Sequence, residues 1–170
     1  VKEKAGEPDE EISFTIWDYG GQEVFYALHH LFLTQYGVYV LVFDMRELLG
    51  KEHFEDILEE EEVEKLDSQE EALETLCFWI DSIRLHAPNV KIAIVGTYLD
   101  EVPSLEQHKE IDQILRTKVL NKKHGGLSTV IGNTTGKGKK KTTLYFFPID
   151  NMDRQDADER VSRLRVALSA

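Results

Sequence analysis

The sequence predicts an α/β domain with a doubly wound, mostly parallel sheet. Two short apolar runs, at residues 38–43 and 91–95, are rich in Val, Ile and aromatic residues, and segments of helical periodicity separate and follow them. Such alternation is typical of β–α–β units, whose strands are parallel. Ligands of these folds bind beyond the carboxyl ends of the strands. The loops to search for function are therefore those at residues 18–22, 44–47, 96–100 and 148–151.

The first expected strand covers residues 12–17, where Ile or Phe alternates with Ser or Thr. A period of two is typical of a strand with one better-buried face. This strand ends at Asp-Tyr-Gly-Gly (residues 18–21), and apolar residues at helical spacing predict a helix over 23–34. The run at 38–43 contains no charged residue and predicts a central parallel strand covered on both faces.

The second half of the chain predicts helices with recognisable starts. Ser68 and Glu71 have the spacing of a capping box, so we expect a helix from there to about residue 86. Ser104 and Gln107 open the next helix. Residues 121–142 are rich in Gly, Lys and Thr and predict a long loop that contributes nothing to the core. The last expected elements are a strand over 144–147, stopped by Pro148, and a helix over about 156–168.

Composition restricts the class of protein. The chain has 170 residues, is 41% hydrophobic and 31% charged, and has a formal net charge of −12. These values fit one globular domain and exclude disorder over the whole length. The single cysteine, Cys77, excludes a disulfide scaffold, and its apolar neighbours favour a reduced core thiol in a cytoplasmic protein. No apolar run is long enough for a membrane span, no leader is expected, and Val at position 1 favours a piece of a longer chain.

Charge is concentrated in two segments. Residues 51–74 contain 12 acidic and 2 basic residues, so most of the net charge lies there, and we interpret about 50–67 as an acidic surface insertion. Residues 116–141 contain 8 Lys or Arg and no acidic residue. A nucleic-acid role would require aromatic residues among these basic ones, and there are none, so we expect no nucleic-acid partner. The basic 121–142 loop is instead expected to be solvated or to attract an acidic surface.

The first chemical motif is Asp18-Tyr-Gly-Gly-Gln22, directly after the first expected strand. An acid in this place can hold a hydrated Mg²⁺, a glycine lets a backbone N–H approach a terminal phosphate, and a following Gln can orient an attacking water. An equally good interpretation from geometry alone is a sharp strand-to-helix turn, with Asp18 capping the helix.

The second motif is Gly96-Thr-Tyr-Leu-Asp100, at the end of a buried strand. A carboxylate placed there can accept hydrogen bonds from N1–H and the exocyclic amine of guanine, a pattern that adenine does not offer. Taken alone, this motif also fits a plain start of the following helix. Its combination with Asp18 to Gln22, in the expected order along the chain, favours a nucleotide site.

Together these residues resemble the Roc domain, the Ras-like GTPase module of large multidomain Roco proteins. The resemblance covers residues 17–33, WDYGGQEVFYALHHLFL, and the following VYVLVFDMREL, which are similar to switch II and the next strand of that family. The DxxGQ pattern maps onto Asp18 to Gln22. The fold implied is the Ras-like P-loop NTPase fold, and the chain over 1–170 would be a partial Roc GTPase domain.

The resemblance also implies roles for individual residues. Asp18 would contact Mg²⁺ through water, the Gly21 amide would touch the γ-phosphate, and Gln22 would position the attacking water. Thr97, Tyr98 and Asp100 would surround the guanine base of GTP or GDP, with Thr97 where Ras-like proteins have Asn. The loop after the last strand, with Asp150 and Asn151, lies where Ras-like proteins contact the base through the backbone, although its residues depart from their pattern.

One part of the family pattern is missing. The phosphate-binding motif GxxxxGK[ST] does not occur in the 170 residues. Gly132-Asn-Thr-Thr-Gly-Lys137 is one residue too short, is followed by Gly, and comes after the base-reading strand. Because the Ras-like order places the phosphate loop and switch I before Asp18, we expect a domain incomplete at its amino terminus.

These observations favour a GTP-binding, slowly hydrolysing switch domain of a larger signalling protein, inactive as this fragment. The family implies a COR domain and repeat domains in the same parent chain and a role in homodimerisation. The alternative is a non-catalytic GTPase-fold scaffold for protein interaction. A phospho-acceptor receiver domain, with Asp44 or Asp18 as target, is disfavoured because Phe147-Pro-Ile149 offers no Lys on the last strand.

Overall fold

The chain divides into two compact units, residues 1–32 and 33–170, in a computed structural model. In the first unit the structure describes Thr15 to Asp18, which are exposed and form no strand, so the prediction of a strand is wrong for these residues. A strand requires a hydrogen-bonded neighbour, and no described strand pairs with this segment. The predicted helix over 23–34 lies almost wholly outside the described residues. The residues that the structure describes are 15–18, 33–50, 62–121, 126–136, 138, 141–150 and 157–169. For 62–68 and 157–158 the description covers the backbone alone.

The second unit is built on a parallel sheet in the order β1-β2-β5, which confirms the predicted α/β class. β1 (Val38–Asp44) and β2 (Lys91–Thr97) pair along their whole length, whereas β5 (Phe147–Pro148) pairs only with the end of β2. β3 (Asn133–Thr135) and β4 (Thr142–Leu144) form a separate antiparallel hairpin. The helices are α1 (Met45–Leu48), α2 (Glu62–His86), α3 (Leu105–Ile114), its π-helical continuation η3 (Leu115–Val119) and α4 (Ala157–Leu168).

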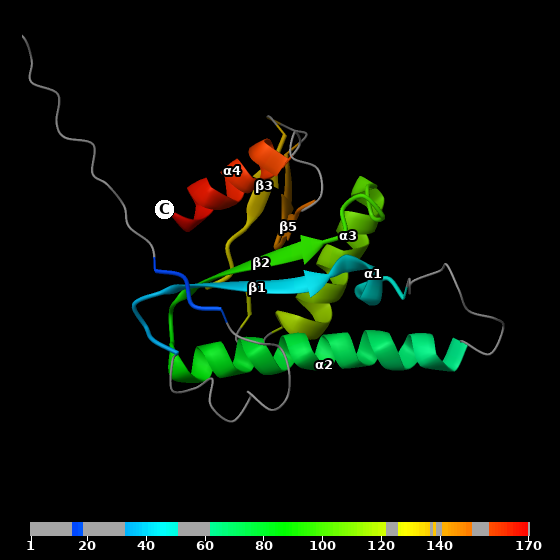
Figure 1. Cartoon of the computed structure of the whole chain (residues 1–170), viewed down its shortest axis with the longest axis horizontal. Helices are drawn as coiled ribbons and strands as arrows, with labels where there is room; N and C mark the ends of the chain where they lie inside the picture. Colours follow the sequence, from blue (N-terminus) through cyan, green and yellow to red (C-terminus); the bar gives the residue numbers. More distant parts are fainter. Residues whose placement is uncertain are drawn as a thin grey trace, which may run out of the picture. The chain divides into compact units, whose positions relative to one another are not determined.

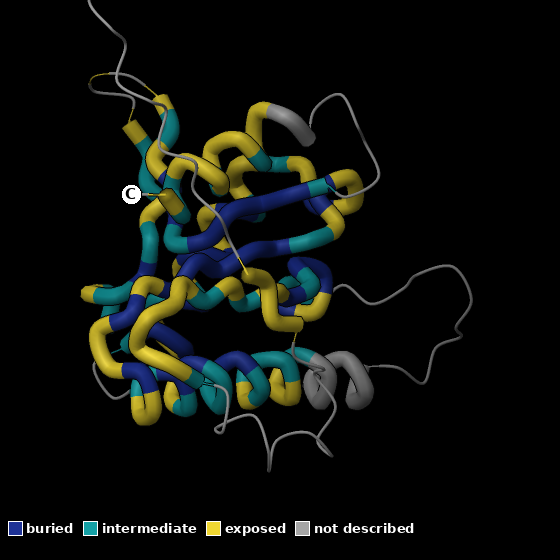
Figure 2. The backbone as a smooth tube through the Cα atoms, turned by 60° about the vertical axis from the view of Figure 1, so that its left-hand side comes forward, coloured by how far each residue is buried: buried dark blue, intermediate teal, exposed yellow. Residues whose placement is uncertain are grey.

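Helices cover β2 on both faces (Figure 1). Ile92 and Ile94 pack into the larger core cluster with α2 and α3, whereas Ala93 and Val95 pack with β5 against α4. Figure 2 shows the resulting pattern: the middle of the sheet is buried, and helical turns that face outward are exposed. Burial of both faces explains why β2 reads as a continuous apolar run in the sequence.

Within the described residues of the second unit, β1 is covered on one face only. Tyr39, Leu41 and Phe43 face the core, while Val38, Val40 and Val42 are 42%, 46% and 58% exposed. The prediction of a strand covered on both faces is therefore wrong for the valine face as the structure describes it. The reason is that α4 packs against β2 and β5 and does not extend over β1.

The long helix α2 begins at Glu62, six residues before the predicted start. Ser68 lies inside the helix, so the predicted capping box at Ser68 is wrong. The preceding glutamates are good helix formers, and negative charge is favourable in the first turn of a helix, so both effects extend the helix toward its amino end. Residues 51–61 of the predicted acidic insertion lie outside the described residues, and 62–67 belong to α2.

The predicted cap of α3 is confirmed. The Ser104 hydroxyl accepts a hydrogen bond from the Gln107 amide at 3.2 Å, and the Gln107 side chain accepts one from the Ser104 amide at 3.3 Å. Satisfying these otherwise unpaired backbone donors stabilises the first turn. The predicted last helix is also confirmed, since α4 covers Ala157–Leu168.

The prediction that residues 121–142 contribute nothing to the core is wrong. Val130 is buried and lies beside Ile92, whose amide donates to the Thr129 carbonyl at 2.9 Å. Because β5 pairs only with the end of β2, the beginning of β2 has free backbone groups on that edge, and residues 129–131 satisfy some of them. The same segment then forms β3 of the hairpin.

The predicted strand over 144–147 is divided between two sheets. Leu144 ends β4 in the hairpin, and Phe147 begins β5 in the main sheet. Between them, the Tyr145 amide donates to Asp112 Oδ1 at 2.6 Å, and the Phe146 carbonyl accepts from Asn133 Nδ2 at 3.3 Å. Side chains thus replace strand partners at the point where the chain changes sheets.

Candidate functional site

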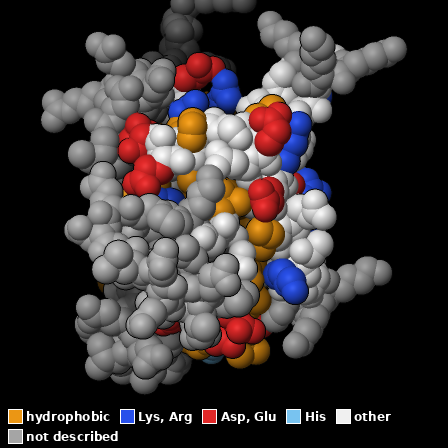
Figure 3. Space-filling view, turned by 90° about the vertical axis from the view of Figure 1, so that its right-hand side faces the viewer, with side chains coloured by type: hydrophobic (Ala, Val, Ile, Leu, Met, Phe, Trp, Pro, Cys, Tyr) orange, Lys and Arg blue, Asp and Glu red, His pale blue; other side chains and the backbone are white. Residues whose placement is uncertain are grey.

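The carboxyl ends of the three parallel strands meet at one end of the second unit. Asp44 lies opposite Thr97, and Gly96 lies opposite Pro148 in the register. The Ile149 amide also donates to the Gly96 carbonyl at 2.8 Å. Figure 3 looks onto this end and shows acidic, basic and apolar side chains close together. The loops predicted at 44–47, 96–100 and 148–150 are therefore neighbours.

The buried guanidinium of Arg46 connects two of these loops. Arg46 is 4% exposed and forms ion pairs with Asp44 (Nη2 to Oδ2, 2.7 Å) and Glu101 (Nη1 to Oε1, 2.8 Å). Hydrogen bonding to Asp44 raises the pKa of Arg46 above its usual range. Asp44 also caps α1, because its carboxylate accepts a hydrogen bond from the Arg46 amide at 2.8 Å. Because the Asp44 carboxylate is bound by both the guanidinium and the backbone amide of Arg46, the ion pair has one well-defined geometry.

Arg46 also stacks on Tyr98, the middle residue of the second sequence motif. Its guanidinium carbon lies 3.4 Å from the centre of the Tyr98 ring, and Tyr98 as a residue remains 40% exposed. Tyr98 has a φ of 62°, a left-handed conformation that costs a residue with a Cβ roughly 1–2 kcal/mol. The cation–π contact, together with a hydrogen bond from the Val102 amide to the Tyr98 carbonyl (3.0 Å), holds this conformation in place.

The two residues after Tyr98 point in different directions, one into the core and one into solvent. Leu99 is 4% exposed and packs in the main core cluster, whereas Asp100 is exposed. The Thr97 hydroxyl donates to the Phe43 carbonyl at 3.1 Å, so this side chain ties β2 to β1. Leu99 therefore anchors the loop in the core, while Asp100 stays at the surface beyond the end of β2.

Gly96 lets the site loop pack closely against the start of α1. A Cβ at this position would lie 2.6 Å from Met45 Cγ and 3.1 Å from Phe146 Cδ2. Real Cβ atoms essentially never approach another atom as closely as 2.6 Å, so a larger residue would displace Met45 or the strand. The glycine of the motif is thus required by packing between β2 and α1.

The remaining predicted site residues are only partly described. Asp150 is half-buried and follows β5 at the same end of the sheet. Asp18 is exposed and belongs to the first unit, and Gly21, Gln22 and Asn151 lie outside the described residues. The structure therefore brings together Thr97, Tyr98, Asp100 and the loop of Asp150, and the predictions for Asp18, Gly21, Gln22 and Asn151 stay predictions.

Arg46 is the residue that the sequence analysis missed. The sequence does contain a pattern that could have indicated Arg46, because Asp-Met-Arg directly follows the apolar run of an expected strand. A charged residue at the carboxyl end of a buried parallel strand lies at the edge where ligands bind, and an acid two residues earlier can hold it there.

Two negative findings apply to the part of the chain that the structure describes. No three His, Cys, Asp or Glu side chains gather there as ligands for a metal ion. None of the helices described is long and apolar enough to cross a membrane. Two acids at this end of the sheet, Asp44 and Glu101, form ion pairs with Arg46.

Comparison with known proteins gives the class and the family. Residues 1–100 match the family described as "Ras of Complex, Roc, domain of DAPkinase". The probable serine/threonine-protein kinase roco6 of Dictyostelium discoideum is 30% identical over 107 residues, which cover 63% of this chain and 4% of that protein. Leucine-rich repeat serine/threonine-protein kinase 1 of Mus musculus is 31% identical over 91 residues, 54% of this chain and 4% of that protein. No solved structure matches the chain.

The parallel sheet, its covering helices and this match define a domain with the Ras-like P-loop GTPase fold. Within that class, the chain belongs to the Roc family. It spans only 3–4% of the length of the roco5 and roco6 kinases of Dictyostelium discoideum that it matches.

Proposed function

We propose that this chain supplies the guanine-reading half of a GTP-dependent switch in a larger protein. The single observation that supports this most strongly is the fixed loop from Thr97 to Asp100. It lies at the carboxyl end of β2, is anchored by Leu99 and Arg46, and presents an exposed carboxylate beside a partly exposed aromatic ring. That combination suits a purine, with a flat surface for the ring and an acceptor for its donors.

Each residue would have a separate role with guanine bound. Asp100 would accept hydrogen bonds from N1–H and the exocyclic amine, and the Tyr98 ring would flank the base. Thr97 would act through the backbone, because its hydroxyl is used by the Phe43 carbonyl. The backbone after β5, at Ile149 and Asp150, would border the base on its other side.

The phosphates and Mg²⁺ would be held by other parts of the protein. Asp18, Gly21 and Gln22 carry these roles in the proposal, together with a phosphate loop encoded upstream. The uncovered valine face of β1 supports an upstream partner, because apolar side chains at Val38, Val40 and Val42 are left in solvent. Among the described residues, β1 pairs with β2 alone, so its other edge is open to a further strand.

The rest of the proposed function concerns the parent protein. We propose a cytoplasmic multidomain signalling protein in which GTP binding and slow hydrolysis alter the segment after Asp18, with COR and repeat domains in the same chain and a homodimeric assembly. The relatives support a multidomain parent, since they are named as kinases and are far longer than this chain.

A nucleotide-binding experiment tests the proposal. In a longer chain that includes the upstream part of the gene, Asp100→Ala should weaken GDP binding about ten- to a hundredfold, because hydrogen bonds to a charged group contribute about 1.5–3 kcal/mol. Glu106→Gln, a charge change in the first turn of α3, is the matched control and should leave affinity unchanged. If Asp100→Ala keeps both the affinity and the preference for GDP over ADP, the assignment of Asp100 is wrong.

A scaffold without hydrolysis is the second candidate. It is favoured by the absence of GxxxxGK[ST] from these 170 residues, because that loop supplies most of the hold on a triphosphate. An upstream gene sequence that lacks this motif would support the scaffold, and one that contains it would support the switch.

A further inference from the structure

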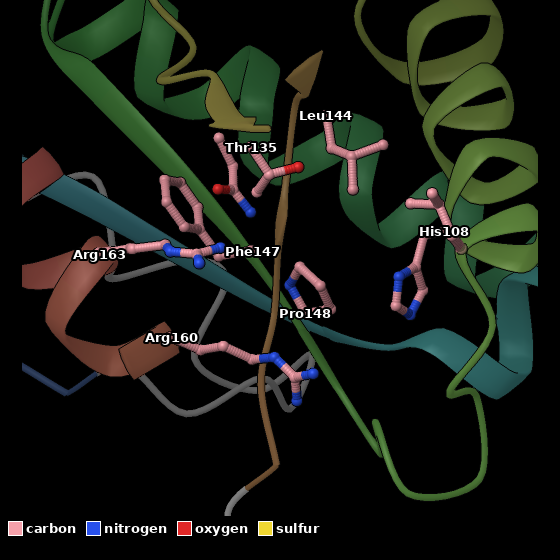
Figure 4. Close-up of a pocket in the computed structure, with 9 residues that line it drawn as sticks. His108, Thr135, Leu144, Phe147, Pro148, Arg160 and Arg163 are labelled. Carbon is pink, nitrogen blue, oxygen red and sulfur yellow. The ribbon is translucent and has the colours of Figure 1, made fainter. Parts of the chain in front are cut away.

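A separate pocket lies at the outer edge of β5, between α3, α4 and the β3–β4 hairpin (Figure 4). It encloses about 230 Å³. Of the described residues in the candidate nucleotide site, Pro148 alone lines this pocket, and no residue of 97–101 does, so the two sites adjoin at the end of β5 but differ in their other residues. Its described walls come from α3, the hairpin, β5 and α4, and the side chains that would contact a ligand are Leu105, His108, Leu144, Phe147, Arg160 and Arg163.

The pocket has an apolar side and a cationic side. Leu144 and Phe147 are buried side chains of its wall, and Leu105, 44% exposed, adds apolar surface at its rim. Arg160 and Arg163 reach toward it from α4 (Figure 4), and none of the described residues that line it is acidic. A ligand that matches both sides needs an anionic group next to an apolar one.

The two arginines have donors to spare. Arg160 forms no hydrogen bond or ion pair with the residues that the structure describes. Arg163 pairs with Glu159, a carboxylate that is 78% exposed, and its planar guanidinium has further N–H groups. Pairs with such an exposed partner are weak and are readily exchanged for another carboxylate.

His108 gives the pocket an acceptor as well. Its side chain is buried and points toward Pro148 (Figure 4), and its Nε2 lies 2.8 Å from the Val102 carbonyl. Because a carbonyl only accepts, Nε2 carries the proton when the ring is neutral, which leaves Nδ1 as an acceptor. Burial is the main cause that lowers the pKa of His108, and the nearby charge of Arg160 lowers it further. Both favour the neutral form of the ring.

Size and charge point to a peptide. The volume is below the roughly 300–1,000 Å³ of pockets that hold drug-sized ligands, so one or two side chains fit better than a cofactor. Among the described residues that line the pocket, the two that carry a full charge are both cationic, Arg160 and Arg163. Two guanidinium groups in one pocket would attract an acidic segment of a partner.

We propose that this pocket binds an acidic peptide segment of a partner protein, in which a Glu or Asp carboxylate neighbours an apolar side chain. The carboxylate binds Arg160 and Arg163, the apolar side chain packs on Leu144 and Phe147, and a peptide N–H donates to His108 Nδ1. Arginine clusters recognise acidic motifs in this way in other peptide-binding domains.

The test uses the 170-residue chain and labelled, end-capped peptides, with fluorescence anisotropy as the readout. A Glu-Phe-Glu peptide should bind saturably, and Arg160→Gln or Arg163→Gln should each weaken it about fivefold or more. Arg165→Gln removes an exposed charge from the same helix outside the pocket, so it should change affinity less than about twofold.

Two further peptides separate the pocket from diffuse charge attraction. Gln-Phe-Gln lacks the carboxylates and Glu-Ser-Glu lacks the apolar group, and both should bind at least about fivefold more weakly. The proposal is overturned if Glu-Phe-Glu does not bind, if Arg165→Gln weakens it as much as Arg160→Gln, or if Glu-Ser-Glu binds equally well. None of these results depends on nucleotide binding.

Discussion

Replacing Arg46 by Met should destabilise the domain by about 3 kcal/mol, because several contacts depend on one buried guanidinium. Met keeps most of the apolar stem and removes the charge. The pair with Asp44 should contribute about 1.5–3 kcal/mol, because Asp44 is only 18% exposed. The pair with Glu101, which is 50% exposed, should add about 0–1 kcal/mol, and the stack on Tyr98 about 0.5–1 kcal/mol.

A fully buried charge that loses its partner destabilises a protein by about 3–5 kcal/mol. The loss of unfolding free energy expected for Arg46→Met lies at the lower end of that range. Asp44 retains the hydrogen bond from the backbone amide of residue 46, and water can reach its carboxylate. These contacts also share atoms, so their separate values do not simply add.

Urea unfolding of the 170-residue chain, followed by circular dichroism, measures this prediction. With a denaturant slope of about 2 kcal/mol/M, the midpoint should fall by about 1.5 M. Arg165→Met, on an exposed surface of α4, is the control and should shift the free energy of unfolding by less than about 0.5 kcal/mol. The double variant with Asp44→Asn should show a coupling of at least about 1.5 kcal/mol. A loss no larger than the control, or no coupling, would refute the role given to Arg46.

Two further predictions concern packing and pH. Gly96→Ala should destabilise by about 1–3 kcal/mol, because its Cβ would lie 2.6 Å from Met45 Cγ. Gly37→Ala, where no atom lies within 4 Å, should change the unfolding free energy by less than about 0.5 kcal/mol, and equal effects in urea unfolding would contradict the packing argument. Burial lowers the pKa of His108 in the folded state, so the unfolded chain gains the proton first as pH falls below about 6.5, and stability drops from that pH downward. His108→Gln should lose less stability than the wild type between pH 7.5 and pH 5, and an identical loss would exclude His108 as the cause.

Local signals in the sequence predicted the elements that depend on near neighbours. The cap at Ser104 and Gln107 is contained within four residues, and the apolar run of β2 follows from burial on both faces. The position of the loop from Thr97 to Asp100 follows from the end of that run. For these features, residues close in sequence supply the physical cause, so the pattern alone was sufficient.

The features that the sequence did not predict depend on residues that are far apart along the chain. Val130 is buried because β5 leaves the start of β2 unpaired, and this follows from the short pairing of β5 rather than from Val130 itself. Likewise, Arg46 meets Glu101 across 55 positions of the chain. Contacts of this kind are set by how the strands align, which no local pattern contains. The open valine face of β1 was also unexpected, because its residues resemble those of a fully covered strand.

The central claim is that Asp100 faces guanine, and a crystal structure tests it most directly. The protein to solve is the longer chain with its upstream segment, bound to GDP and Mg²⁺. We expect the Asp100 carboxylate within hydrogen-bond distance of both N1 and the exocyclic amine, with the Tyr98 ring beside the base. A base bound elsewhere, or an Asp100 carboxylate that points into solvent away from the base, would show that Asp100 does not read guanine.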